Sequence, residues 1–250
     1  MKLTVNQNFS QTICVPCIQR QQGQIHQWLL SHEKLYTPFY TSVDIRDAGF
    51  KIAVIDTNLF PSGFNNLCEH GLADAEGLIK KAIRTRVPNA ANILIVAEEH
   101  TRNTWYLENV RILQEIITKA GFGAKIATLK EIKRGEADFD LIIMNNDLSA
   151  GIPEELRAVK IPIFPSIHAG WHARLKSEHF RHANALMKEF ATIVGLDPWQ
   201  FSCLYEVVNH VDINNEPDRQ RLYAAAVKLF EEIQNKYREH HVEGKPFIFI

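Results

Sequence analysis

The sequence predicts an α/β fold with a mostly parallel open sheet, flanking helices, a C-terminal helix and a terminal strand. Apolar, β-prone segments alternate with amphipathic helical patterns through the first two thirds of the chain, and four of these segments run directly into polar loops. Such alternation is typical of a parallel sheet, and ligands of open parallel sheets sit beyond the carboxyl ends of the strands. We therefore expect four strand ends to converge on one polar crevice.

The elements follow in a regular order. An amphipathic helix is expected over residues 25–36, a strand at 51–55, a helix over 74–86 and a strand at 93–97. The clearest helix spans 107–120, and Gly121 is placed to end it in a left-handed conformation. Strands are expected at 124–129, 141–145 and 161–164, and helices over 177–195 and 217–240. Region 198–215 fits neither period, and the β-prone run 246–250 is the expected terminal strand.

Length and composition limit the class of protein. The 250 residues suit one or two domains. A formal net charge of -1 lacks the basic excess of a nucleic-acid-binding protein. No apolar stretch approaches the roughly 20 residues of a membrane span, and the N-terminus lacks the apolar core of a signal peptide. We expect a cytoplasmic protein that binds small molecules and neither nucleic acid nor membrane.

The four cysteines are expected to be free thiols. Cys14 and Cys17 form a CxxC pair, but the pair does not follow a strand, as a redox motif should, and it lacks the second ligand pair of a zinc site. We interpret the pair as two small residues packed in an N-terminal segment.

The first polar loop follows the strand at 51–55. Four of its side chains can bond an ammonium or carboxylate group: Asp56, Asn58, Asn65 and Asn66. Asn and Asp also form turns by bonding their own backbone, so a structural role stays open. Arg46, just upstream, is a candidate carboxylate clamp because its planar fork can donate to two oxygens. The alternative for Arg46 is a surface salt bridge with a neighbouring aspartate.

The second and third loops follow the strands at 93–97 and 141–145. In the second, Asn103 or a neighbouring threonine can cap the next helix, whereas His100 and Arg102 are not needed for a cap and are better candidates for anion binding. The third loop offers a dense set of donors and acceptors, with a tight turn as the alternative. Its members are Asn145, Asn146, Asp147 and Ser149.

The fourth loop is rich in histidine. A metal site is disfavoured, because no Asp or Cys joins the histidines at ligand spacing. We expect instead that five residues line the crevice: His168, Trp171, His172, Arg174 and Lys176. His179 and His182 are interpreted as surface residues, and no metal-binding residue is predicted.

Several known motifs are missing: the chain has no Walker loop, no GxGxxG after a strand and no GxSxG. Six blocks, however, occur in the order found in one family. They are SVDIRDAGFKIAVIDTNLFPSGFNNL, EEHTRNTWYLENV, NNDLSAGIPEEL, HAGWHARLKSEHF, GLDPW and KYREHHVEGKPFIFI. From about Tyr40 onward the chain resembles the proteobacterial-type glutamate-cysteine ligases, and residues 1–40 fall outside the resemblance.

The resemblance implies a pre-ATP-grasp, Rossmann-like domain and an ATP- and magnesium-dependent ligase that makes γ-glutamylcysteine for glutathione. It also implies a nucleotide site in a later ATP-grasp region, so we expect neither ATP nor Mg²⁺ to bind this chain strongly and expect it to be inactive alone. Its expected organisation is an extension at 1–40, a substrate-side domain at 41–170 and a helical segment at 171–250. The alternative is a non-catalytic amino-acid or nucleotide-binding module that partners a separate ATP-binding chain.

Overall fold

The computed structural model describes residues 9, 13–33, 38–99, 102–132, 138–246 and 248. The chain divides into two compact units that interleave along the sequence. Unit 1 comprises Met1–Tyr36, Val43–Asp56 and Lys176–Ile250, and unit 2 comprises Thr37–Ser42 and Thr57–Leu175. The sequence-based division into 1–40, 41–170 and 171–250 stays a prediction about domains.

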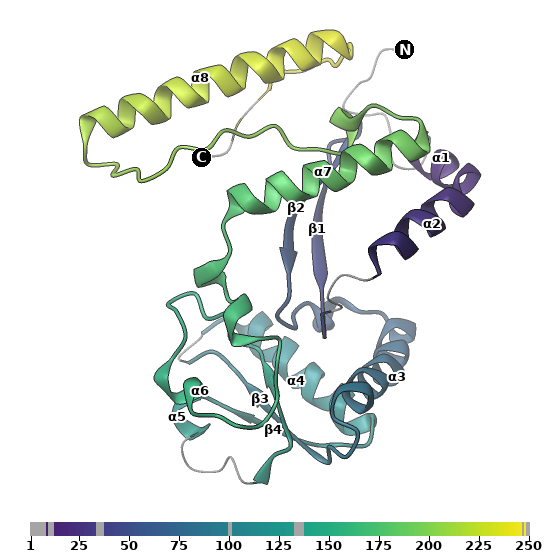
Figure 1. Ribbon diagram of the computed structural model, residues 1–250, viewed down its shortest axis with the longest axis vertical. Coiled ribbons are helices and arrows are strands. Elements are labelled where there is room, and N and C mark those ends of the chain that lie inside the picture. The colour runs from purple at the N-terminus through teal and green to yellow at the C-terminus, as the bar shows by residue number, and fades with distance from the viewer. Residues whose placement is uncertain are drawn as a thin grey trace. The chain divides into compact units, whose positions relative to one another are not determined.

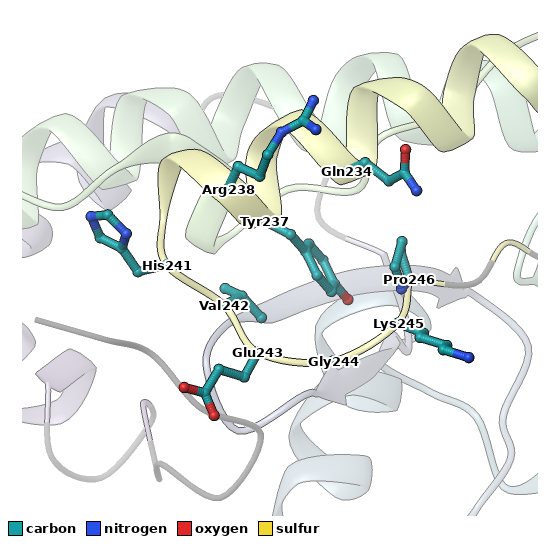
Figure 2. Close-up of a pocket in the computed structure, with 9 residues that line it drawn as sticks. All are labelled: Gln234, Tyr237, Arg238, His241, Val242, Glu243, Gly244, Lys245 and Pro246. Atoms are coloured by element: carbon teal, nitrogen blue, oxygen red, sulfur yellow. The ribbon is translucent and has the colours of Figure 1, made fainter.

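Unit 1 contains the long helices of the second half of the chain. Its helices are α1 (Val15–Arg20), α2 (Gln22–His32), α7 (Lys176–Val194) and α8 (Glu216–Glu239), with a short 3-10 turn, η6 (Pro198–Gln200), between α7 and α8. Phe9, Ala191 and Phe201 are fully or almost fully buried in one apolar cluster, and Phe50 packs with Trp199 in a second. After α8 the chain turns at His241, which has a φ of 53°, and runs back beneath the helix (Figure 2).

Most of two further strands also belongs to unit 1. β1 (Ser42–Asp47) and β2 (Ile52–Asn58) pair in a two-stranded sheet of their own, and the four residues that join them make this a hairpin. The strand predicted at 51–55 therefore exists but does not join the parallel sheet, which corrects the expectation of four parallel strand ends. β1 escaped the sequence analysis because SVDIRD is largely exposed and lacks an apolar run.

Unit 2 is built on a four-stranded sheet, of which Figure 1 labels β3 and β4. Its strands are β3 (Asn92–Val96), β4 (Gly123–Ala127), β5 (Leu141–Met144) and β6 (Ile163–Phe164), in the order β4-β3-β5-β6. Each neighbouring pair is parallel, with Ile93 opposite both Ala124 and Leu141. The predicted α/β class with a parallel sheet and a C-terminal helix is confirmed. Of the predicted terminal strand at 246–250, residues 247, 249 and 250 lie outside the described residues.

Both faces of the two central strands, β3 and β5, are buried. Ile93 and Ile95 of β3 point into a cluster with α3 (Glu69–Arg86) and α4 (Thr104–Lys119). Leu94 and Val96 point into a second cluster that contains one residue from each of two short helices, α5 (Leu129–Ile132) and α6 (Glu154–Arg157). Successive residues of a strand face opposite sides, so a strand buried on both sides must be apolar throughout. The sequence of β3 after Asn92, ILIV, meets that requirement.

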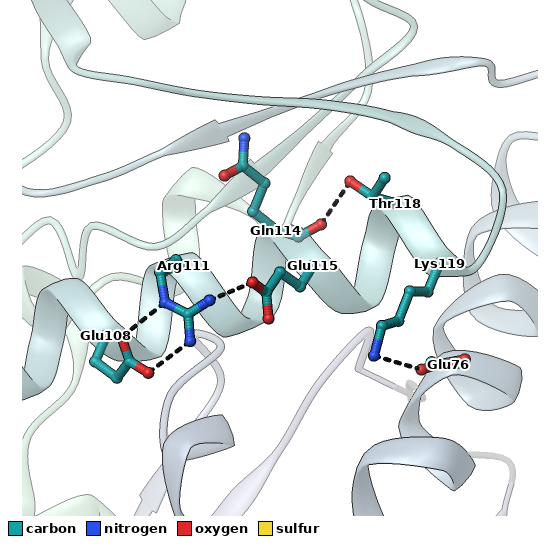
Figure 3. A network of polar contacts seen from close by, with 7 residues as sticks. All are labelled: Glu76, Glu108, Arg111, Gln114, Glu115, Thr118 and Lys119. Carbon is teal, nitrogen blue, oxygen red and sulfur yellow. Dashed lines mark hydrogen bonds and ion pairs between the residues drawn. The ribbon is translucent and has the colours of Figure 1, made fainter.

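Helix α4 holds the expected amphipathic face. Val110, Leu113 and Ile117 are buried, Asn103 caps the N-terminus through its side-chain oxygen, and Gly121 has a φ of 93° just after the end. On the outer face, Arg111 pairs with Glu108 at 2.6 Å and also contacts Glu115 (Figure 3). Lys119 reaches Glu76 of α3 at 3.5 Å, so one ion pair links the two helices that cover this side of the sheet (Figure 3).

The cysteines are free thiols. Cys14 and Cys17 are buried at the start of α1 in the apolar cluster with Phe9. Burial, followed by the neighbouring Cys17, raises the pKa of the Cys14 thiol. A reactive thiol needs a lowered pKa, so this environment supports the interpretation of the CxxC pair as packed side chains. No helix among the described residues is long and apolar enough to cross a membrane.

Replacing Leu113 by alanine should lower the free energy of unfolding by roughly 2–5 kcal/mol, because Leu113 is fully buried between α4 and the sheet and its loss leaves a cavity. Leu78→Ala on α3 is the matched control, since Leu78 is 67% exposed and its truncation should change stability by less than about 0.5 kcal/mol. Urea unfolding followed by circular dichroism measures both. Equal destabilisation of the two variants would contradict the described core.

Candidate functional site

The carboxyl edge of the parallel sheet in unit 2 gathers polar side chains from three segments. Glu98 follows β3, the Asn145–Ser149 turn follows β5, and residues 166–174 follow β6. The loop 59–66, which leaves β2, also reaches this edge, since the side-chain nitrogen of Asn145 donates to the carbonyl oxygen of Pro61. The loop predicted to contribute to the crevice is therefore present there, although its strand lies in another sheet.

Tyr106 of α4 ties two strand ends together. Its hydroxyl oxygen accepts a hydrogen bond from the backbone N–H of Glu98 at 2.8 Å, and its hydroxyl donates to the carbonyl oxygen of Asn145 at 3.2 Å. Burial is the main cause that raises the pKa of Tyr106 to about 12, with Glu98 and Asp147 adding to it. The phenol therefore stays protonated at neutral pH and can keep its donor role.

Asn145 is the most buried polar residue of the edge. Only 5% of it is exposed, and its backbone N–H extends the sheet by donating to Val96 at 2.8 Å. With its side-chain nitrogen committed to Pro61, the side-chain oxygen Oδ1 is buried without a hydrogen-bond partner. An unpaired buried acceptor is unfavourable, so this oxygen is a group that a bound donor would satisfy.

Two carboxylates lie near one another at this edge. Burial raises the pKa of Glu98, and the charge of Asp147 raises it further. The direction of the shift means that the charged form of Glu98 is disfavoured in the folded chain. A positively charged ligand group would relieve both causes.

The loop after β6 closes on the turn after β5. The backbone N–H of Trp171 donates to the carbonyl oxygen of Asp147 at 2.9 Å, and Nδ1 of His172 lies 3.0 Å from the carbonyl oxygen of Leu148. A side chain at Gly170 would place its Cβ 2.8 Å from both His172 Nδ1 and Leu148 Cβ. Only glycine permits this close approach, which fixes the two loops against each other.

Arg174 lies at the end of this loop. Its Nη2 donates to the carbonyl oxygen of Thr57 and lies 3.3 Å from the Thr57 hydroxyl, and its guanidinium carbon lies 5.2 Å from the centre of the Trp171 ring. Nη1 is buried and has no hydrogen-bond partner. Among the residues that the structure describes, no carboxylate forms an ion pair with Arg174. The geometry leaves a guanidinium that can donate to an anion.

Several other predicted site residues have local structural roles. Asn58, Asn146 and Asp147 each accept a hydrogen bond from a backbone N–H two residues ahead, at 3.0 Å, as expected of Asx turns. Asn103 is the helix cap. Asn65 and Asn66 lie in a 3-10 turn, η2 (Phe64–Asn66), which Asn109 holds by accepting from the N–H of Phe64 at 2.9 Å.

The remaining predicted site residues do not lie together at this edge. Arg102, Ser149 and His168 are exposed in unit 2, while His100 lies outside the described residues. In unit 1, Arg46 is exposed on β1, and Lys176 pairs with Asp56 at 2.7 Å. The structure thus brings Asn145, Asp147, Trp171, His172 and Arg174 together but supplies no common site for the full predicted set.

Sequence reasoning missed Glu98 and Tyr106. Glu98 could have been found, because it stands two residues beyond a buried strand, where the carboxyl edge of a parallel sheet begins. Tyr106 carries no such signal. It lies in the first turns of α4 and looks like one of the apolar residues of that helix, and only the fold places its hydroxyl between two strand ends.

A cavity of about 490 Å³ lies elsewhere, at the end of α8 in unit 1 (Figure 2). Its lining residues belong to α8 and the following turn: Gln234, Tyr237, Arg238, His241, Val242, Glu243, Gly244, Lys245 and Pro246. The Tyr237 ring extends from the helix toward the returning chain, whereas the Glu243 carboxylate points away from it (Figure 2). No predicted site residue lines this cavity, so it is separate from the polar edge in the residues that form it.

The sequence model of the glutamate-cysteine ligase family, GshA, matches residues 16–138 and 130–250. The chain belongs to the glutamate-cysteine ligase family. The match begins at residue 16, so the resemblance extends further toward the N-terminus than the expected start near Tyr40 and includes Cys17 of the CxxC pair. A comparison with curated proteins found no match.

A solved structure supports the same assignment. The ligase-family chain is similar to a protein from Methylobacillus flagellatus KT that is provisionally described as a γ-glutamylcysteine synthetase, with 34% identity and a TM-score of 0.82. The similarity covers 91% of this chain and 60% of the M. flagellatus chain. This chain therefore spans about three fifths of the length of that relative.

The raised pKa of Glu98 predicts a pH-dependent stability. A carboxyl group whose pKa is higher in the folded chain binds more protons when folded, so the free energy of unfolding falls as pH rises from the ordinary value of 4.5 through the raised pKa. Glu98→Gln removes this loss. The melting temperature of the variant should therefore gain on the wild type as pH rises through that window, in melts recorded across a pH series.

Glu108→Gln is the control of opposite sign. Hydrogen bonding to Arg111 lowers the pKa of Glu108, so its stabilising effect is present above the ordinary pKa and lost as pH falls through the lowered one. That variant should melt below the wild type at neutral pH and approach it in acid. A difference between Glu98→Gln and wild type that does not change with pH would show that Glu98 is not perturbed.

Proposed function

We propose that this chain forms the amino-acid side of a ligase that joins glutamate and cysteine in an ATP-dependent reaction, giving γ-glutamylcysteine for glutathione biosynthesis. The proposal depends on two kinds of group that lie at the same sheet edge. One is the guanidinium of Arg174, which has no carboxylate partner among the described residues. The other is a set of hydrogen-bond acceptors, namely the Glu98 and Asp147 carboxylates and the unpaired Asn145 oxygen. Membership of the glutamate-cysteine ligase family indicates the class of reaction, and the charged groups at the sheet edge indicate which ligand groups can bind there. A free amino acid carries both charges that these groups need.

Arg174 is the proposed receptor for a substrate carboxylate. A guanidinium offers donors in a planar fork that match the two oxygens of a carboxylate, and Arg174 has one such nitrogen buried and unpaired. The Trp171 ring and the Thr57 contacts hold the fork in place before any ligand arrives. A preorganised donor loses little entropy on binding, which favours this residue over the exposed Arg46 and Arg102 as the main carboxylate contact.

Glu98, Asp147 and Asn145 are the proposed receptors for a substrate ammonium group. The carboxylates supply charge, and the unpaired oxygen of Asn145 supplies a neutral acceptor. An ammonium has three donors and no acceptor, so three acceptors at one edge suit it. Binding would lower the raised pKa of Glu98, because the cation offsets the repulsion from Asp147.

The same residues do not fit a triphosphate. Glu98 and Asp147 would repel phosphate oxygens, and Arg174 is one guanidinium without a lysine or backbone nest beside it in the described contacts. The nucleotide and Mg²⁺ of the proposed reaction therefore need groups beyond this edge. We propose that these lie in the part of such a ligase that corresponds to the uncovered two fifths of the M. flagellatus protein, or in a separate chain. No step of the chemistry is assigned to this edge.

Thermal shifts test the proposal with this 250-residue chain. Glutamate, cysteine or γ-glutamylcysteine, at about a hundred times its dissociation constant, should stabilise the chain by about 2.7 kcal/mol, or roughly 5–10 °C for this size. ATP with Mg²⁺ should give no shift by itself. A shift with ATP alone, or no shift with any amino-acid ligand, would overturn the assignment of the edge.

Substitution of Arg174 locates the carboxylate contact. Arg174→Gln should weaken amino-acid binding by about 10-fold or more, since a charged hydrogen bond contributes about 1.5–3 kcal/mol. Arg174→Lys should recover part of the affinity, because it restores the charge without the fork. Each variant is compared with its own ligand-free melting temperature. Arg181→Gln is the matched control, because Arg181 is an exposed arginine paired with Glu178 on α7 and should leave binding unchanged.

A further inference from the structure

Three metal-ligating side chains of unit 1 meet where the end of α8 lies against η6. Asp197 precedes η6, Glu239 is the last residue of α8, and His240 follows it. The Nε2 atom of His240 lies 3.5 Å from Oδ2 of Asp197 and 4.0 Å from Oε1 of Glu239. One ligand atom from each residue lies within 4.8 Å of the other two. Among the described residues this is the one group of His, Cys, Asp or Glu side chains arranged in this way.

Each of the three side chains is held by a contact on its other side. Oδ1 of Asp197 accepts from the N–H of Trp199 at 2.8 Å, and Oε2 of Glu239 lies 2.8 Å from Nζ of Lys236. The His240 ring stacks on the Trp199 ring, with the ring centres 4.2 Å apart and the planes inclined by 18°. The second oxygen of each carboxylate is thereby left facing His240. Outer contacts of this kind orient the ligands in known metal sites.

One nitrogen of the group, Nε2 of His240, lacks a hydrogen bond within the described part of the chain. This nitrogen is buried, and only 14% of the His240 side chain is exposed. Oδ2 of Asp197, at 3.5 Å, and Oε1 of Glu239, at 4.0 Å, do not form a hydrogen bond with this nitrogen. Their spacing suits a shared ion better, because two ligands about 2.1 Å from a tetrahedral metal lie about 3.4 Å apart.

The surrounding charges narrow the class of ion. The ammonium groups of Lys236 and Lys51 both interact electrostatically with Asp197, and both disfavour a second positive charge there. Lys236 is bound to the oxygen of Glu239 that faces away from the group. Burial lowers the pKa of Lys51 to about 8, and its Nζ donates to the carbonyl oxygen of Ser202 at 2.6 Å. A hard ion held by charge alone would gain little here, whereas an ion that bonds imidazole nitrogen would gain the most from the unpaired Nε2.

We propose that Asp197, Glu239 and His240 bind one divalent transition-metal ion of the Zn²⁺ or Co²⁺ class. Nε2 of His240, Oδ2 of Asp197 and Oε1 of Glu239 are the ligands, and water completes the coordination. The ion links the end of α8 to the turn after α7. This site shares no residue with the polar edge of unit 2, so it does not depend on the proposed ligase function.

Co²⁺ is the probe, because its visible absorption reports the ligand field. The metal-free 250-residue chain, purified without a polyhistidine tag, is titrated with Co²⁺ up to about 1 mM, where even a dissociation constant of about 1 mM gives half saturation. The expected result is one equivalent of Co²⁺, displaced by Zn²⁺ and not by Mg²⁺. His240→Gln should weaken binding by at least about 10-fold, the lower end of the loss seen when outer contacts of metal sites are removed.

Asp197→Asn is the second variant, because its amide oxygen can still accept from Trp199 and keep η6 intact while one anionic ligand is lost. It should also weaken Co²⁺ binding by about 10-fold or more. His182→Gln is the control, since His182 faces Glu178 at 3.8 Å on α7 without a third ligand. Circular dichroism shows whether each variant is folded. Absence of Co²⁺ binding to the wild type, or equal binding by folded wild type, His240→Gln and Asp197→Asn, would overturn the proposal.

Discussion

The pairing of β3 on both sides is the constraint on which unit 2 depends. Ile93, Leu94, Ile95 and Val96 are all at most 3% exposed, so every backbone polar group of this segment must be bonded within the protein. β4 and β5 supply those bonds. The ladder continues past the strand, where Ala97 donates to Ala127 at 2.9 Å and Asn145 donates to Val96 at 2.8 Å. The polar residues that follow are therefore placed by the sheet itself.

This extension of the ladder explains how an apolar core ends in a charged edge. Glu98 and Asn145 lie at the end of the hydrogen-bonded ladder of the sheet. The Tyr106 hydroxyl, from α4, hydrogen-bonds to the backbones of both. The low dielectric of the neighbouring core raises the pKa values of Glu98 and Tyr106 and makes the unpaired oxygen of Asn145 unfavourable. Packing that favours the fold thus also creates the polar groups that a ligand can satisfy.

Unit 1 is organised around a different kind of contact. Trp199, only 5% exposed, stacks with Phe50 at 5.9 Å and with His240 at 4.2 Å, and the ammonium of Lys51 lies 4.5 Å above its ring. One aromatic side chain therefore joins the β1–β2 hairpin, the turn η6 and the end of α8. Aromatic rings can combine apolar burial with attraction to a cation, which allows a lysine to sit in a largely buried environment.

Local patterns in the amino-acid sequence are enough to predict the class of the fold, the strands of the parallel sheet, the main helices and the polar character of the loops that follow the strands. These features depend on local periodicity, on caps such as Asn103 and on turn residues such as Gly121, all of which can be read within a few residues. The tertiary contacts are needed to see that β2 pairs with β1, that Arg174 has no carboxylate partner within the described part of the chain while Asp56 has a cationic one, and that Tyr106 joins two strand ends. Those outcomes depend on which segments meet in the folded chain, and a pattern of apolar and polar residues does not encode the identity of a pairing partner, whether that partner is the next strand along the chain or a residue as distant as Lys176 is from Asp56.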